Sequence, residues 1–390
     1  MRSSTRRTIL WALALVVALS LVLLAFVQGD AEVDDATPEP SPGPVVPDDP
    51  GDGCGRAATT DPDDLSVDRT VARCGPGAPA PRPLDRPAAV TIAVSERSEV
   101  VAPVLVADAL GELEAENLDV ELVDLDQGEA YEAMAAGDVD VVVGGVDAPF
   151  FDAVHEGLDA RLVLGGPVAR RPNDLDTAQT GLWLRADLIS DDDEWDNVEG
   201  QTVLVPGGIG SAALYPIDAL VTQNELTANA IDLVDAPPDQ AAERLRQAAV
   251  GGAWLPAPAA TSVADDEALI QVATLPGSES LGGTVFAPRL LGADRDTGVA
   301  IARAIIRTIN THLADGYSDE ARSALADGLG VGEDAIADGP DPLFDWEVRT
   351  GTVTRIEDAL ITVGGVRYDQ PTSEDALVDR AMQADAISPG

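Results

Sequence analysis

The glycine-rich stretch VPGGIGSAALY, residues 205–215, has the residue types and spacing of a ligand-binding turn. Gly208, Gly210 and Ala213 match the dinucleotide fingerprint G-x-G-x-x-A, and a short apolar run, TVLV, precedes them. The acid that would hold a ribose fits poorly, because Asp235 lies 25 residues past Gly210 where about 20 is expected. The stretch also lies beyond an export segment, whereas dinucleotide cofactors are cytosolic. We therefore expect no nucleotide cofactor here.

A helix that starts after glycines can serve other ligands. Its free N–H groups and partial positive charge attract anions or carbonyl oxygens, and glycine lets the backbone approach a ligand closely. Ser211 can cap the helix or offer its hydroxyl to a ligand. The sequence therefore predicts ligand contacts at Gly208, Gly210 and Ser211. A glycine-rich turn before a capped helix is the structural alternative.

Three further loops are expected to face the same site, because ligands in open α/β sheets bind at the carboxyl ends of strands. The candidate contacts are Ser95 and Arg97 in SERSEVVAP, Val146, Asp147 and Ala148 in GGVDAPF, and Trp254 and Pro256 in WLPAP. Structural alternatives exist for some of them. Asp147 also suits a helix N-cap, and Trp254 also suits core packing, which we favour for Tyr215 and Phe150.

The charges of these loops indicate the kind of ligand. The loops carry one basic residue, Arg97, against the acids Glu96, Glu99 and Asp147. A sulfonate or phosphate usually attracts forked arginine contacts. We therefore hypothesise a small neutral or amine-bearing organic ligand, such as a pyrimidine-type vitamin precursor. An anion held by backbone N–H groups and a helix dipole is the alternative.

Enzymatic chemistry has little support in the sequence. The two histidines, His155 and His312, each fall late in an expected helix and match neither a metal site nor a catalytic triad. Neither G-x-S-x-G nor H-E-x-x-H occurs. We expect a protein that is not an enzyme and that has no cofactor and no metal. The net charge of −45 also argues against a nucleic-acid partner.

Short apolar runs alternate with helical patterns from residue 89 onward, which is typical of an open parallel α/β sheet. The expected strands of the first series are AVTIAV (89–94), LDVELVDL (118–125), VDVVVGG (139–145) and ARLVLGG (160–166). A second series starts near residue 180, and helices are expected at 297–314, 318–328, 351–363 and 371–384. About 300 residues exceed what one core usually supports, so we expect two lobes with a cleft between them.

The N-terminal residues indicate export. Arg2, Arg6 and Arg7 precede an uncharged run from Ile9 to Val27, which is long enough to span a bilayer as a helix. We predict that residues 1–29 anchor the chain to the cell membrane and that the remainder is extracytoplasmic. A cleaved signal peptide, which would give a secreted protein, is the alternative.

Residues 30–88 are rich in proline, aspartate and glycine, so they are predicted to form a disordered tether. The only two cysteines of the chain, Cys54 and Cys74, lie in this segment. A single pair in an oxidising compartment most simply forms a disulfide, and its spacing does not fit a CxxC redox or metal site.

Residues 89–166 resemble the first lobe of the ABC-transporter solute-binding proteins for nitrate, sulfonate, taurine and thiamine precursors. The resemblance rests on a strand followed by APVLVADALGELEAENLDVELVDLDQGEAYEAMAAGDVDVVVGGVDAPF. In the second half, LRADLISDDDEWDNVEGQTVLVPGGIGSAAL is similar to the start of the second lobe of these proteins, and LRQAAVGGAWLPAPAA to a later step of it.

This resemblance implies an α/β fold of the type II periplasmic-binding-protein class with a ligand cleft between two lobes. Lobe 1 would comprise residues 89–182 and 284–390, and lobe 2 residues 183–283. The implied function is delivery of a small organic solute to ABC permease subunits. A membrane-anchored sensing module of the same fold, not coupled to transport, is the main alternative, and a surface protein that has lost its ligand is another.

Overall fold

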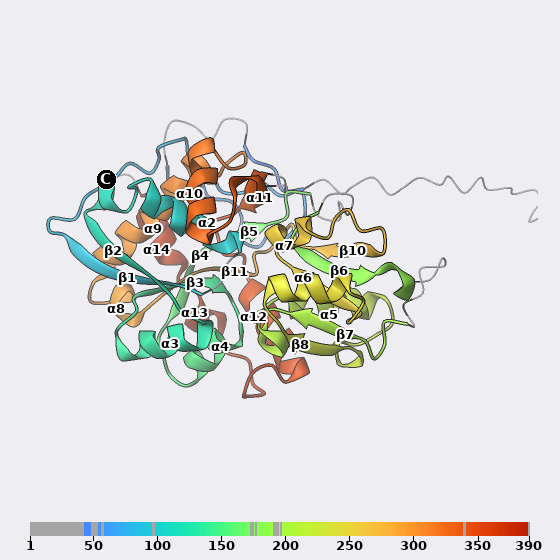
Figure 1. Cartoon of the computed structure of the whole chain (residues 1–390). Helices are drawn as coiled ribbons and strands as arrows, with labels where there is room; N and C mark the ends of the chain where they lie inside the picture. Colours follow the sequence, from blue (N-terminus) through green and yellow to red (C-terminus); the bar gives the residue numbers. More distant parts are fainter. Residues whose placement is uncertain are drawn as a thin grey trace, which may run out of the picture. The chain divides into compact units, whose positions relative to one another are not determined.

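The computed structural model describes residues 43–47, 54–55, 58–95, 98–171, 175, 178–189, 195, 197–337 and 341–388 (Figure 1). The predictions for residues 1–29 and for Arg97 lie outside the described residues. Among the described residues, no helix combines the length and apolar character needed to cross a membrane.

The first sheet, here called sheet I, has five strands in the order β2-β1-β3-β11-β4. They are β1 (Ala88–Val94), β2 (Leu118–Asp124), β3 (Val141–Gly145), β4 (Arg161–Gly165) and β11 (Gly282–Phe286). β1 runs parallel to β2 and β3, but β11 runs antiparallel to both its neighbours, β3 and β4. The sheet is therefore mixed, and the prediction of a parallel sheet is wrong at β11. This strand returns from the second sheet instead of following a crossover helix.

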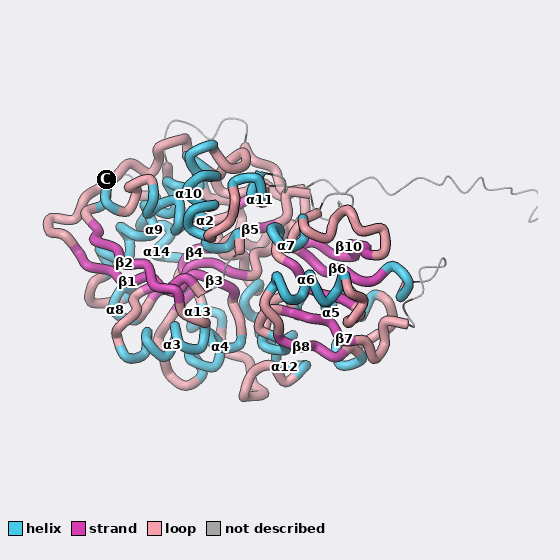
Figure 2. Tube along the Cα trace, viewed as in Figure 1, coloured by secondary structure: helices cyan, strands magenta, loops and turns pink. Residues whose placement is uncertain are grey.

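Helices cover both faces of sheet I (Figure 2). On one face, α2 (Ala102–Ala109), α9 (Arg295–His312), α10 (Asp319–Leu329) and α14 (Arg380–Ile387) share one apolar core. On the other, α3 (Gln127–Ala136) and α4 (Ala148–His155) share a second core. The ends of α3 follow from local chemistry. The side chain of Asp126 accepts from the N–H of Glu129, and Gly137 ends the helix at a φ of 86°.

The second sheet, here called sheet II, has the order β10-β6-β9-β7-β8. Its strands are β6 (Gly181–Arg185), β7 (Thr202–Val205), β8 (Asp232–Asp235), β9 (Gly252–Leu255) and β10 (Leu269–Thr274). β7 is parallel to β8 and β9, whereas β6 is antiparallel to β9 and β10, so this sheet is also mixed. α6 (Pro238–Arg246) packs against β9 and β7, and α5 (Leu214–Gln223) against β10.

The C-terminal part of the chain contacts elements of both halves. α12 (Thr352–Val363) packs against α5 and also against α4. The single helix predicted at 371–384 is two helices, α13 (Glu374–Leu377) and α14. The break occurs where the backbone N–H of Asp379 donates a 3.0 Å hydrogen bond to the carbonyl of Leu162 in β4. A contact with the sheet edge thus replaces one helical turn.

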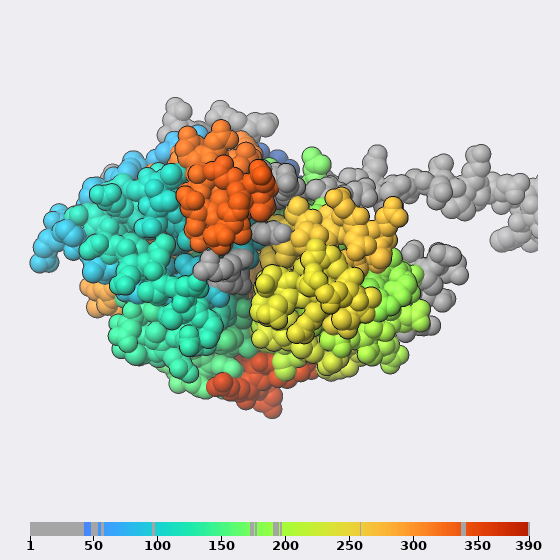
Figure 3. Space-filling view, in the orientation of Figure 1, coloured from blue at the N-terminus to red at the C-terminus, as the bar shows by residue number. Residues whose placement is uncertain are grey.

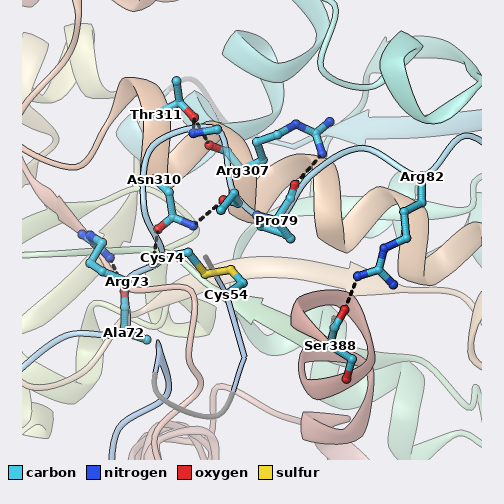
Figure 4. Close-up of a disulfide and its surroundings, with 12 residues drawn as sticks. Cys54, Ala72, Arg73, Cys74, Pro79, Arg82, Arg307, Asn310, Thr311 and Ser388 are labelled. Atoms are coloured by element: carbon cyan, nitrogen blue, oxygen red, sulfur yellow. Dashed lines mark hydrogen bonds between the residues drawn. A yellow bond between two sulfur atoms is a disulfide. The ribbon is translucent and has the colours of Figure 1, made fainter. Parts of the chain in front are cut away.

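Most of residues 69–79 are buried, so the prediction of a disordered tether is wrong for this part of the segment. Val71 and Ala72 are fully buried. The Oδ1 of Asn310 in α9 accepts from the N–H of Cys74 at 3.2 Å, and its Nδ2 donates to the carbonyl of Ala78 at 3.0 Å (Figure 4). Side chains of α9 therefore satisfy the backbone of a segment whose composition alone favours disorder. Cys54 and Cys74 form a disulfide, as predicted.

Candidate functional site: a pocket between the strand ends of two sheets

A pocket of about 1060 Å³ lies among the loops that follow the parallel strands of both sheets. Sheet I contributes the loops after β1, β2 and β3, and sheet II those after β7, β8 and β9. Leu329 and Val331, at the end of α10, also line the pocket. In the space-filling view, the orange surface of α10 lies above the line where the teal and yellow surfaces meet (Figure 3). The pocket thus occupies the strand ends where open α/β sheets bind ligands.

Six of the ten predicted contact residues line this pocket. They are Ser95, Asp147, Gly210, Ser211, Trp254 and Pro256. Three others, Val146, Ala148 and Gly208, are buried beside it but are not part of its lining. Arg97 lies outside the described residues. The four predicted loops therefore meet at one place, and a direct ligand contact by any of these side chains stays a prediction.

Asp147 occupies the N-cap position of α4, but its carboxylate makes no capping hydrogen bond there. Its Oδ1 accepts a 2.6 Å hydrogen bond from the backbone N–H of Ala212, which follows β7 in sheet II. Desolvation by burial raises the pKa of Asp147 to about 6, while hydrogen bonds from Ala212 and the side chain of Gln127 oppose the rise. Asp147 therefore connects the two walls of the pocket, which the N-cap interpretation did not foresee.

The glycine-rich stretch forms a tight turn before it becomes a helix. A 3-10 turn spans Gly208–Gly210, and α5 begins at Leu214 rather than directly after the glycines. Ser211 does not cap α5, whose N-cap position is Ala213. Asp235 has a role that the fingerprint did not indicate, because its Oδ1 accepts a 2.8 Å hydrogen bond from the N–H of Gly207. The acid at the end of β8 thus holds the glycine turn.

Glycine at position 210 allows a close approach between the two walls. A Cβ at this position would lie 3.1 Å from the Cβ of Ala148, at the start of α4. Gly208 has a φ of 57°, a left-handed conformation that favours glycine. These glycines therefore shape the turn and allow the two walls to meet, which supports the structural alternative at Gly208.

Glu99 is a pocket residue that the sequence reasoning counted among the charges of the loops but did not name as a ligand contact. It lies in a short 3-10 helix (Glu99–Val101) and is 7% exposed. Its Oε1 accepts a hydrogen bond from the Oγ of Thr180, which itself accepts from the N–H of Ala257 at 2.7 Å. Burial raises the pKa of Glu99, partly offset by the bond from Thr180. Thr180 was missed, because a lone threonine before a strand gives no recognisable signal.

Trp254 belongs to the core and also lies on the pocket wall. It is 6% exposed, packs with the apolar core around α5, and lines the pocket. Phe150 is fully buried core, as predicted, with its ring 5.9 Å from that of Tyr131. Tyr215 is partly buried, and its hydroxyl donates a 2.8 Å hydrogen bond to Glu279. The aromatic residues therefore shape the pocket mainly through the core behind it.

The described residues contain no cluster of three or more histidine, cysteine, aspartate or glutamate side chains that could hold a metal ion. His155 ends α4 and stacks on Tyr368 with ring centres 3.9 Å apart. His312 ends α9, and its Nε2 lies 3.7 Å from a carboxylate oxygen of Glu112. Both histidines thus have structural neighbours at helix ends.

The fold is that of the periplasmic solute-binding proteins, which confirms the resemblance seen in the sequence at the level of fold. The ligand-binding component of an ABC-type import system from Staphylococcus aureus, solved with zinc bound, matches with a TM-score of 0.61. The two sequences are 11% identical, over 77% of this chain and 99% of that one. No protein-family model and no curated protein matches the sequence.

Two further structures are similar. The nitrate-binding protein of Synechocystis PCC 6803 matches with a TM-score of 0.57 and 13% identity, over 77% of this chain and 88% of that one. The aliphatic sulphonate-binding protein of Escherichia coli matches with a TM-score of 0.53 and 16% identity, over 73% and 93%. All three are binding proteins.

Proposed function

We propose that this chain is an extracytoplasmic solute-binding protein that delivers a small organic solute to an ABC importer. The observation that carries the proposal is the pocket of about 1060 Å³, which is large enough for a small organic molecule and is lined by strand-end loops of both sheets. It is supported by the fold that the chain shares with a ligand-binding component of an ABC-type import system and with nitrate- and sulphonate-binding proteins. The proposal contains no catalytic step.

In this proposal each sheet is the centre of one lobe. Residues 89–182 and 284–390 form lobe 1, and residues 183–283 form lobe 2. The six predicted contact residues that line the pocket, together with Glu99 and Thr180, surround the solute. Residues 1–29 anchor the chain to the membrane, and permease subunits are its partners.

Ligand capture would work by closure of the two walls. Two contacts already join them, from Ala212 to Asp147 and from Ala257 to Thr180. A solute stabilises the closed arrangement only through the contacts that it makes there and not in the open one. Hinge motion of lobes around a ligand is the usual behaviour of this architecture.

Cross-linking in cells tests the proposal. The full chain is cross-linked at the surface of cells that express it, and its covalent partners are identified by mass spectrometry. We expect a membrane-spanning permease subunit among them. If the partner is instead a signalling receptor, and no permease is captured, the sensing alternative replaces transport.

A further inference from the structure

We propose that the pocket selects organic cations, namely primary amines or amidines, and that Glu99 binds the cationic nitrogen. This inference rests on the proposed function and names the ligand class of the same pocket. It is carried by an unsatisfied acceptor on the pocket wall and by the charges around it.

The carboxylate of Glu99 has one oxygen in use and one without a partner. Oε1 accepts from Thr180, whereas Oε2 is buried and has no hydrogen-bond partner. Buried polar atoms are nearly always hydrogen-bonded, and an unpaired one costs free energy. Glu99 lines the pocket, so a ligand that enters it lies next to this carboxylate. Charge-assisted hydrogen bonds of this kind are the strong ones.

The contacts of the Thr180 hydroxyl identify the donor and the acceptor of its hydrogen bond with Glu99 Oε1. Thr180 Oγ accepts from the backbone N–H of Ala257. A hydroxyl has a single hydrogen, so that hydrogen is left to donate to Glu99. The carboxylate therefore acts as an acceptor on this side. When it is ionised, Oε2 can accept a hydrogen bond from a second donor. An ammonium or amidinium group supplies several donors together with the opposite charge.

The other charges of the described lining favour a cation as well. Its acidic members are Glu99, Asp124, Asp126, Asp147, Asp235 and Asp239. Among the described lining residues the one basic side chain is Arg246, which is already paired with Glu243 at 2.7 Å. A pocket lined mostly by one sign of charge raises the local concentration of the opposite sign.

Calorimetric titration of the full chain with matched probes tests this inference. The first set is benzylamine, benzyl alcohol and benzoate, which share one skeleton and differ in charge. Further cationic probes are putrescine and agmatine, and further anionic probes are methanesulfonate and nitrate. We expect the amines to bind at least about tenfold more tightly than their neutral or anionic counterparts. Glu99→Gln should weaken amine binding at least about tenfold, because it keeps the shape and removes the charge. Glu121→Gln, an exposed position on β2, is the matched control and should bind as the wild type does.

A second measurement keeps the test independent of folding defects. Glu99→Gln replaces a buried ionisable group by a neutral one of the same shape, so the free variant should melt no lower than the wild type. Binding of the anionic or neutral probes in preference to the amines would overturn the inference while leaving the proposed function intact. Equal amine affinities for Glu99→Gln and wild type would overturn it as well. If no probe of any charge binds, both the inference and the proposed function are contradicted.

Discussion

The backbone N–H of Ala212 donates a 2.6 Å hydrogen bond to Oδ1 of Asp147. Asp147 follows β3 of sheet I and Ala212 follows β7 of sheet II, so one hydrogen bond spans the two walls of the pocket. The acceptor is a half-buried carboxylate whose pKa is raised to about 6 by desolvation. The contact between the walls is therefore also a titratable one.

We predict that Asp147 makes the protein less stable as the pH rises from about 4 to about 6. Its pKa is about 6 when folded and ordinarily 3.8, so the folded state binds the proton more tightly between these values. The free energy of unfolding should therefore fall with rising pH, by up to about 3 kcal/mol from this residue. In Asp147→Asn this part of the pH dependence should vanish, as measured by urea unfolding at several pH values. Asp119→Asn, at an exposed site on β2, is the control, and curves for Asp147→Asn that run parallel to the wild type would contradict the assignment.

A side chain at Gly210 should push the two walls apart. A Cβ there meets the Cβ of Ala148 at 3.1 Å, so Gly210→Val is expected to lower the free energy of unfolding by about 1–3 kcal/mol and to weaken solute binding. Gly332→Val is the matched control, because a Cβ at Gly332 meets no atom within 4 Å. Thermal melts and titrations of both variants check this, and equal behaviour of the two would show that the approach at Gly210 is unimportant.

Glu116, a buried acid next to helix α9, should be critical for stability. Glu116 accepts from Arg303 at 2.6 Å and from Arg307 at 2.8 Å, and all three side chains are buried. Glu116→Ala leaves two buried guanidinium groups without their shared partner and should cost about 3–5 kcal/mol. Urea unfolding measures the loss, and Glu121→Gln should change stability by less than about 0.5 kcal/mol.

The same arginines hold the N-terminal segment, which gives the prediction a second readout. Arg303 donates to the carbonyl of Arg82 at 3.0 Å, and Arg307 to that of Pro79 at 3.1 Å. In Glu116→Ala, limited proteolysis should cut near residues 79–87 faster than in the wild type. An unchanged cleavage rate would mean that other contacts hold this segment.

The disulfide should contribute measurably to stability. It joins Cys54 and Cys74 across 20 residues, and in the chain-entropy model a loop of this length is worth about 3 kcal/mol. We expect the double variant Cys54→Ser, Cys74→Ser to lose about this much, by chemical unfolding without reductant. Dithiothreitol should destabilise the wild type to the same degree and leave the double variant unaffected. A wild type that is insensitive to reductant would contradict the contribution.

Short-range sequence patterns correctly predicted the strands that such patterns encode. The apolar runs at 89–94 and 118–125 form β1 and β2, and the polar residues after them lie at the pocket because strand ends meet at one sheet edge. What was missed depends on partners far along the chain. β11 returns antiparallel after an excursion of more than 100 residues through sheet II, and no short-range period encodes that direction.

The packed N-terminal segment and Thr180 were missed for the same reason. The proline- and glycine-rich residues near position 78 were predicted to form a tether from their composition. The side chains that satisfy their backbone, such as Asn310, lie about 230 residues later in the sequence, so no local pattern indicates them. The role of Thr180 depends on Glu99 and Ala257, which no spacing rule connects to it. Asp147 was placed at the pocket, but its partner in sheet II was not foreseen.

The central claim is that this pocket binds a small solute, and a thermal-shift screen of the full chain tests it most directly. The screen compares wild type with Ala259→Trp, which places a large side chain on the pocket wall. The panel includes nitrate, taurine, alkyl sulfonates, aliphatic and aromatic amines, aminopyrimidines, riboflavin and aromatic carboxylates. We predict that one chemical class raises the melting temperature of the wild type by several degrees and leaves that of Ala259→Trp unchanged. No shift with any class, or equal shifts in both proteins, would contradict the claim that this pocket is the binding site.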